Sequence, residues 1–184
     1  MTLNYANAKP MLNASLEIPE LNADALMPKE KKAALSFIRS AHAAEGWSRD
    51  PISLAPLTLL NADVDLSIGA LQYSDMLLKQ VKTKLVLKNN TFVLPRFDAG
   101  LKGGTLKASG TLNAKGELSK EVSFENIPFQ NLVQAHVKDV ALQGLTKGKI
   151  AVNSYGKSLH DWVAHLHGGG HIELVDGKII GFSL

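Results

Sequence analysis

The feature that most constrains this chain is a nine-residue stretch in which apolar and polar side chains alternate without a break. Its apolar positions are Leu60, Ala62, Val64, Leu66 and Ile68. Successive side chains of a β-strand point to opposite faces of the sheet, so this pattern predicts a strand with one dry face and one wet face. Similar alternation returns over residues 81–88 and 106–112. The sequence therefore predicts a mainly β fold with one apolar face.

Short groups of turn-forming residues separate the predicted strands. They are Asn89-Asn90, Ala99-Gly100, Gly103-Gly104, Lys115-Gly116 and Asp176-Gly177. The last of these lies between apolar alternating segments and is the clearest hairpin signal of the set. Because the strands follow one another so closely, we expect an antiparallel meander.

The 184 residues divide into three segments by composition. Residues 1–23 contain one strand, at about residues 8–22, that closes at Pro19. Residues 24–50 form a helical or flexible linker. Residues 51–184 form a β-domain interrupted by two short helices, which we expect to lie across the dry face near one end. Pro128 begins one of these helices, and Ser158 caps the other with Asp161 in the capping-box position, up to Gly168.

Composition excludes several classes of function. The chain has no cysteine, which excludes disulfides, iron–sulfur clusters, cysteine-bound zinc and thiol catalysis. The net charge is only +3, and basic residues gather only at Lys29, Lys31 and Lys32, so a nucleic-acid partner is not expected. Neither a signal peptide nor a transmembrane stretch is visible, so any membrane anchor is expected to lie outside this chain.

The histidines are the first place to look for a metal site. Four of the six are His160, His165, His167 and His171, close to Asp161 and to three consecutive glycines. Imidazole is a common zinc ligand, but spacings of five and two residues do not place these rings on one face of a helix. Solvated histidines near a helix end are the favoured interpretation, and we predict no metal ligand.

No catalytic motif is present elsewhere. The glycine-rich segment 100–105 lacks the Gly-Lys-Ser/Thr order that leads a phosphate-binding loop into a helix. There is no Gly-x-Ser-x-Gly elbow for a hydrolase. Asp63 and Asp65 project to one face of a strand, as a weak cation site or, in the favoured interpretation, as part of a charged outer face. The chain is predicted to be no enzyme and to need no cofactor.

Several stretches, taken in order, resemble the C-terminal region of AsmA-like proteins. They are ADVDL at 62–66, LVLKNN at 85–90, GGTLKASGTL at 103–112, LTKG at 145–148 and HGGGHIELVDGKIIG at 167–181. Each motif is short, and their order and spacing are the specific part. The resemblance covers about residues 50–184, while residues 24–50 do not match the pattern.

The resemblance implies a periplasmic domain tethered to the inner membrane by a helix outside this chain. It implies an elongated, curved antiparallel sheet with an apolar concave face, as in the TamB-related bridge-like envelope proteins, and phospholipid as the partner. The expected function is transport of lipid between the inner and outer membranes. The alternative is an assembly module that influences outer-membrane protein biogenesis through contacts with envelope proteins.

The residues expected to line such a groove are the apolar positions of the alternating strands. Packing as an ordinary closed core is the other interpretation of the same set, because alternation does not distinguish the two. The set is Val64, Leu66, Ile68, Leu85, Leu87, Leu106, Val122, Phe124, Ile150, Val152 and Ile172.

Overall fold

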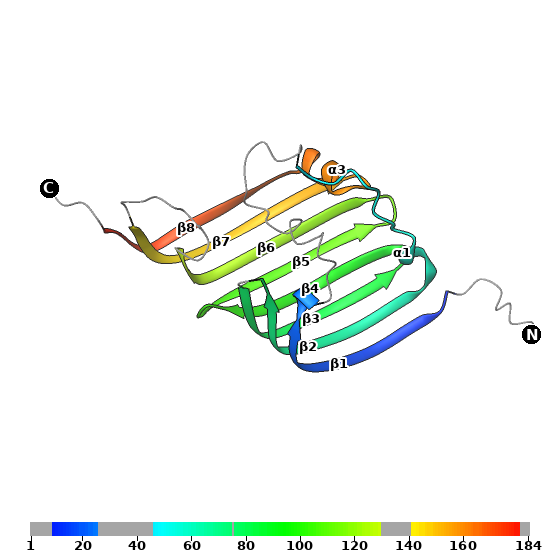
Figure 1. Cartoon of the computed structure of the whole chain (residues 1–184), viewed down its shortest axis with the longest axis horizontal. Coiled ribbons are helices and arrows are strands. Elements are labelled where there is room, and N and C mark those ends of the chain that lie inside the picture. The colour runs from blue at the N-terminus through cyan, green and yellow to red at the C-terminus, as the bar shows by residue number, and fades with distance from the viewer. Residues whose placement is uncertain (1–8, 26–45, 75, 130–140, 181–184) are drawn as a thin grey trace, which may run out of the picture.

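The computed structural model describes residues 9–25, 46–74, 76–129 and 141–180. These residues form one open eight-stranded sheet in which the strands lie side by side in sequence order (Figure 1). The strands are β1 (Met11–Asn22), β2 (Asn61–Tyr73), β3 (Met76–Lys88), β4 (Thr91–Leu101), β5 (Gly104–Asn113), β6 (Glu117–Pro128), β7 (Ala141–Tyr155) and β8 (His167–Ile180). The mainly β prediction is confirmed.

The expected antiparallel order holds from β2 to β8, where every neighbouring pair is antiparallel. It is wrong for β1, which pairs with β2 in parallel, Met11 opposite Asn61 and Asn22 opposite Gln72. A parallel pair needs a crossover of a dozen or more residues, and residues 23–60 supply one. The sheet is therefore mixed.

Three of the predicted turns connect strands as expected. Asn89 and Asn90 both have positive φ, at 52° and 61°, as a two-residue hairpin turn requires. Gly103 (φ 91°) and Gly116 (φ 90°) lie in the turns that follow β4 and β5. Glycine suits these positions because it lacks the Cβ that makes a positive φ costly.

Two predicted turns are wrong. Ala99-Gly100 lies inside β4, and Asp176-Gly177 lies inside β8, which runs on to Ile180. Asp176 has φ 53° and lies near a break in the register between β7 and β8. Aspartate followed by glycine favours a left-handed backbone residue, and a β-bulge can use that conformation as well as a hairpin can. The same dipeptide therefore bends the strand here without ending it.

Comparable bends occur in β3 and β6. Gln80 (φ 50°) lies at a register shift between β3 and β4, and Asn126 (φ 56°) lies at one between β6 and β7. Each extra residue reverses the alternation of side chains beyond it. The main buried cluster is Ile68, Leu78, Val81 and Ala99. Figure 1 shows β2 and β3 turning away from the plane of the sheet at this end.

Helical structure is sparse in the described residues: the turn η1 (Ala23–Ala25) and the helices α1 (Pro56–Leu59) and α3 (Leu159–Ala164). The helix expected after Ser158 is confirmed but ends at Ala164, because His167 already begins β8. Pro128 ends a strand, and the helix expected beyond it falls outside the described residues. Most of the linker expected at residues 24–50 falls outside them too.

Candidate functional site

The strand registers place the predicted groove residues on one face of the sheet, which we call the apolar face. In antiparallel and parallel pairs alike, directly opposite residues share a face. One row that crosses all eight strands is Ile18, Ile68, Val81, Ala99, Leu106, Phe124, Gly148 and Ile172. Within this row, Val81 and Ala99 meet at the bulge between β3 and β4 and belong to the same buried cluster. A second row beside it is Leu16, Leu66, Thr83, Phe97, Ala108, Val122, Ile150 and Gly170.

The four remaining predicted residues lie on the same side. Val64 is opposite Leu85 and lies two residues from Leu66. Leu87 lies two residues further along β3, and Val152 lies two residues from Ile150 on β7. All eleven residues thus share one face, although lining a lipid groove stays a prediction for them.

Burial on the apolar face is uneven. Ile68 and Phe124 are buried, with 4% and 6% of their surface exposed. Ile172 is 56% exposed, and the other eight residues of the predicted set are only partly buried. The buried part of the face is therefore a band near the bends, while its middle keeps contact with solvent.

The buried band continues around the bend of β6. Ile127 is fully buried although it lies three residues from Phe124, because the bulge at Asn126 brings both side chains inward. Thr146, also fully buried, donates its hydroxyl to the Ile127 carbonyl at 2.6 Å. Phe124 lies against Gly148, where an added Cβ would be 2.7 Å from the ring.

Helix α3 packs against β7 at the opposite end of the apolar face, where the sequence led us to expect a helix. Ser154 follows Val152 on this face of β7, is only 4% exposed and donates its hydroxyl to the Trp162 carbonyl at 2.6 Å. The Trp162 indole N–H donates to the Gly116 carbonyl at 3.0 Å. These two bonds join α3 to β7 and to the β5–β6 turn.

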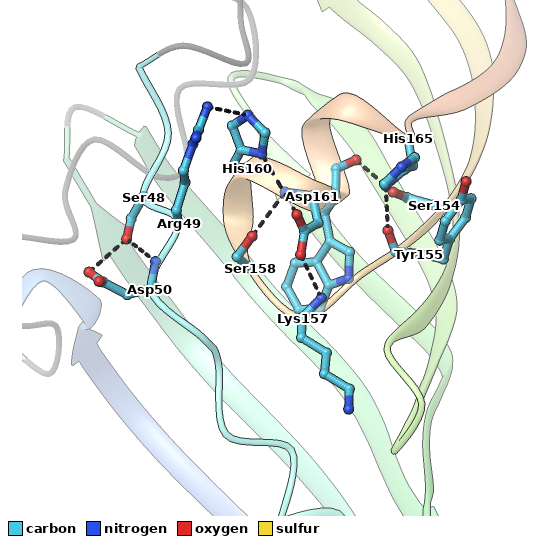
Figure 2. Close-up of polar contacts among 11 residues, drawn as sticks. Ser48, Arg49, Asp50, Ser154, Tyr155, Lys157, Ser158, His160, Asp161 and His165 are labelled. Atoms are coloured by element: carbon cyan, nitrogen blue, oxygen red, sulfur yellow. Dashed lines mark hydrogen bonds and ion pairs between the residues drawn. The ribbon is translucent and has the colours of Figure 1, made fainter.

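Figure 2 shows how α3 begins. The Asp161 backbone N–H donates to the Ser158 hydroxyl at 3.0 Å, which confirms the predicted cap. The Lys157 N–H donates to the Asp161 carboxylate at 3.1 Å. This bond, with smaller contributions from Ser158 and His160, lowers the pKa of Asp161 from its ordinary value of 3.8.

A segment from the other end of the chain attaches here. The His160 N–H donates to the Ser48 carbonyl at 3.0 Å, and the Ile52 N–H donates to the Lys157 carbonyl at 2.6 Å. Figure 1 shows this segment running from α3 along the ends of the strands to α1, just before β2. At that end of the strands, the segment therefore links α3, which packs against β7, to α1, which precedes β2.

Asp161 gives a pH-dependent prediction. A carboxyl whose pKa is lower in the folded state stabilises that state above its unfolded pKa, and the stabilisation is lost as pH falls through the folded pKa. Asp161→Asn keeps an acceptor for the Lys157 N–H but removes the charge. We expect urea titrations to give a less stable variant at pH 7 and a difference that shrinks below about pH 4. A difference that stays constant from pH 7 to pH 3 would contradict this.

The histidines do not converge. His165 stacks on Tyr155 with ring centroids 4.0 Å apart, while His160 faces Arg49 and Asp161. His171 lies on β8, 3.9 Å from the Glu173 carboxylate. Within the described ranges, no group of three or more histidine, aspartate and glutamate side chains could hold a metal ion.

The opposite face of the sheet carries the charges. Lys84 lies between the two aspartates considered above, with its amine 2.5 Å from Asp63 and 3.3 Å from Asp65. Hydrogen bonds to these carboxylates raise the pKa of Lys84. The two aspartates therefore pair with a lysine of the neighbouring strand β3. This agrees with the interpretation that they belong to a charged outer face.

Sequence reasoning missed several residues that build the apolar face. Leu12 and Leu16 of β1 lie on it and are about half exposed; their strand was predicted, but the two residues were not among those predicted to line the groove. Val81 belongs to the predicted alternating stretch at residues 81–88, but it was not among the residues predicted to line the groove. The contact between Trp162 and Gly116 could not be predicted from local sequence patterns, because 46 residues separate the two positions.

The comparison with protein families decides the assignment. A family model described as the AsmA family matches residues 1–184, the whole chain. The chain belongs to the AsmA family. The match extends over residues 24–50, where the resemblance had given no correspondence. No curated protein and no solved structure matches this AsmA-family chain.

In the parts of the AsmA-family chain that the structure describes, no helix has the length and apolar character to cross a bilayer.

Proposed function

We propose that this AsmA-family domain binds phospholipid acyl chains along its apolar face and contributes to lipid transport between the inner and outer membranes. The family is typically associated with the cell envelope. The observation that carries the proposal is the continuous apolar face, buried at its bent end and partly exposed over its middle. A domain with a closed core would leave less apolar surface in contact with water.

The dimensions of the face suit an acyl chain. β2 has 13 residues, which corresponds to about 43 Å of extended strand at about 3.3 Å per residue. Each buried CH2 group of a lipid tail contributes about 0.8 kcal/mol. Because apolar contacts are non-directional, such a face allows the tail to slide while the headgroup stays in water. Such transfer needs no catalytic residue.

The first test is native mass spectrometry of the chain purified without detergent from a bacterial host, followed by lipid extraction. We expect phospholipid at close to one molecule per chain. A stable chain that carries no lipid would overturn the proposal and favour the alternative function, an assembly module that acts through envelope protein partners.

A matched pair of variants tests which face holds the lipid. Leu85 and Val86 are neighbours on β3, both partly buried, with Leu85 on the apolar face and Val86 on the charged face. We expect Leu85→Ser to reduce bound lipid several-fold and Val86→Ser to leave it near the wild-type amount. Circular dichroism and urea titration establish that both variants fold. Equal lipid loss in both folded variants would contradict binding on the apolar face.

A further inference from the structure

The two edges of the sheet differ in how well they are protected from pairing with another strand. The edge strand β1 carries Pro19, which has no N–H to donate, between Glu17 and Glu20. Proline and charge on an edge strand discourage the addition of another strand. At β8, residues 167–173 are all exposed and contain no proline. Within the described residues, β7 is the only strand paired with β8.

The exposed half of β8 is also regular. Its register with β7 is unbroken from Val175 opposite Leu145 to His167 opposite Asn153. The bulge at Asp176 lies beyond this part. A long, regular edge without proline or a bulge is a template for a further strand.

The sequence of this edge is complementary to itself in one antiparallel register. If Gly170 lies opposite Gly170 of a second copy, His167 lies opposite Glu173, and Gly168 lies opposite Ile172. The first pair places an imidazole opposite a carboxylate on the charged face, and it occurs twice by symmetry. The second places an apolar side chain that is 56% exposed over a residue without a side chain. Shifting the centre by one residue pairs His167 with His171, or His171 with its own copy.

We propose that β8 pairs with β8 of a second copy of this chain in that register, about a two-fold axis perpendicular to the sheet. Such an axis keeps the apolar faces of both copies on the same side and makes the two sheets continuous. Ile172 of each copy then packs over Gly168 of the other. This pairing does not depend on lipid binding.

Cross-linking tests the geometry directly, because the chain has no native cysteine. An added Cβ at Gly169 meets no atom within 4 Å, so Gly169→Cys is compatible with the fold. In the proposed dimer, positions 169 of the two copies are diagonal neighbours, about 7–8 Å apart. A short bismaleimide should therefore link Gly169→Cys into dimers. Ser15→Cys, an exposed residue on the same face of β1, should stay monomeric.

A charge exchange tests the register. Sedimentation velocity over a range of concentrations should show a monomer–dimer equilibrium for the wild-type chain. His167→Glu places two carboxylates opposite each other twice per dimer and should weaken association roughly tenfold. Adding Glu173→Lys to that variant should restore it. A wild-type chain that stays monomeric at all concentrations, equal cross-linking at positions 169 and 15, or a double variant as weak as the single one would overturn the proposal.

Discussion

Replacing Ile127 with alanine should reduce the free energy of unfolding by about 2–5 kcal/mol, measured by urea denaturation of the whole chain. Ile127 has no exposed surface and lies where the bulge in β6 turns its side chain into the buried band. Truncation removes apolar contacts and leaves a cavity. The Thr146 hydroxyl, bonded to the Ile127 carbonyl, holds the backbone in place, so the cavity should not collapse. We therefore expect a value in the upper half of the range.

Ile172→Ala is the matched control, because it makes the same truncation on a side chain that is 56% exposed. In a chain dilute enough to be monomeric, we expect it to change stability by less than about 0.5 kcal/mol. If both variants lose the same stability, the buried band is not the core of this sheet. If neither variant changes stability, the bend in β6 does not bury Ile127 in solution.

Gly116→Ala should be about as damaging, with an expected loss of about 2–5 kcal/mol. Gly116 has φ 90°, and an added Cβ would be 1.9 Å from the Gly156 carbonyl oxygen. Its own carbonyl accepts hydrogen bonds from the Trp162 indole and from the Gly156 N–H. A methyl group at this position would displace the turn and loosen α3 from the sheet.

A variant at Gly103 separates the two causes of that loss, which are the positive φ and the close approach of Gly156. Gly103 has φ 91°, almost the same as Gly116, but an added Cβ there meets no atom within 4 Å. Gly103→Ala should therefore cost only the conformational penalty of about 1–2 kcal/mol. Losses of equal size in the two variants, measured by the same urea titration, would show that the approach of Gly156 contributes nothing.

Much of the fold could be predicted because a two-residue period fixes which face each side chain occupies. The alternation of β2 placed Val64, Leu66 and Ile68 together, and the registers agree. The bulges could not be predicted in the same way. Glutamine gives no signal for a left-handed backbone, so the bend at Gln80 was invisible. Asp176-Gly177 did give a signal, but that signal is shared by hairpin turns and bulges.

The sequence predicts which side chains share the apolar face better than it predicts how deeply each of them is buried. Phe124 and Ile172 lie in the same row, yet one is buried and the other is mostly exposed. This difference depends on where the strands bend, because Phe124 lies two residues before the bulge at Asn126 and Ile172 does not lie beside such a bend. Local periodicity carries no information about these bends. The parallel pairing of β1 was missed for a similar reason, because it depends on where a long connection returns the chain.

That parallel pairing has a consequence for the order in which the sheet forms. Neighbouring strands from β2 to β6 are joined by short connections, whereas each paired residue of β1 is 50 positions from its partner in β2. Closing so long a loop costs more entropy than closing a hairpin. We therefore expect the meander to assemble first and β1 to join it late. In native-state hydrogen exchange, the amides of β1 should exchange through a local opening that has a lower free energy than the opening that exposes the amides of β3–β6.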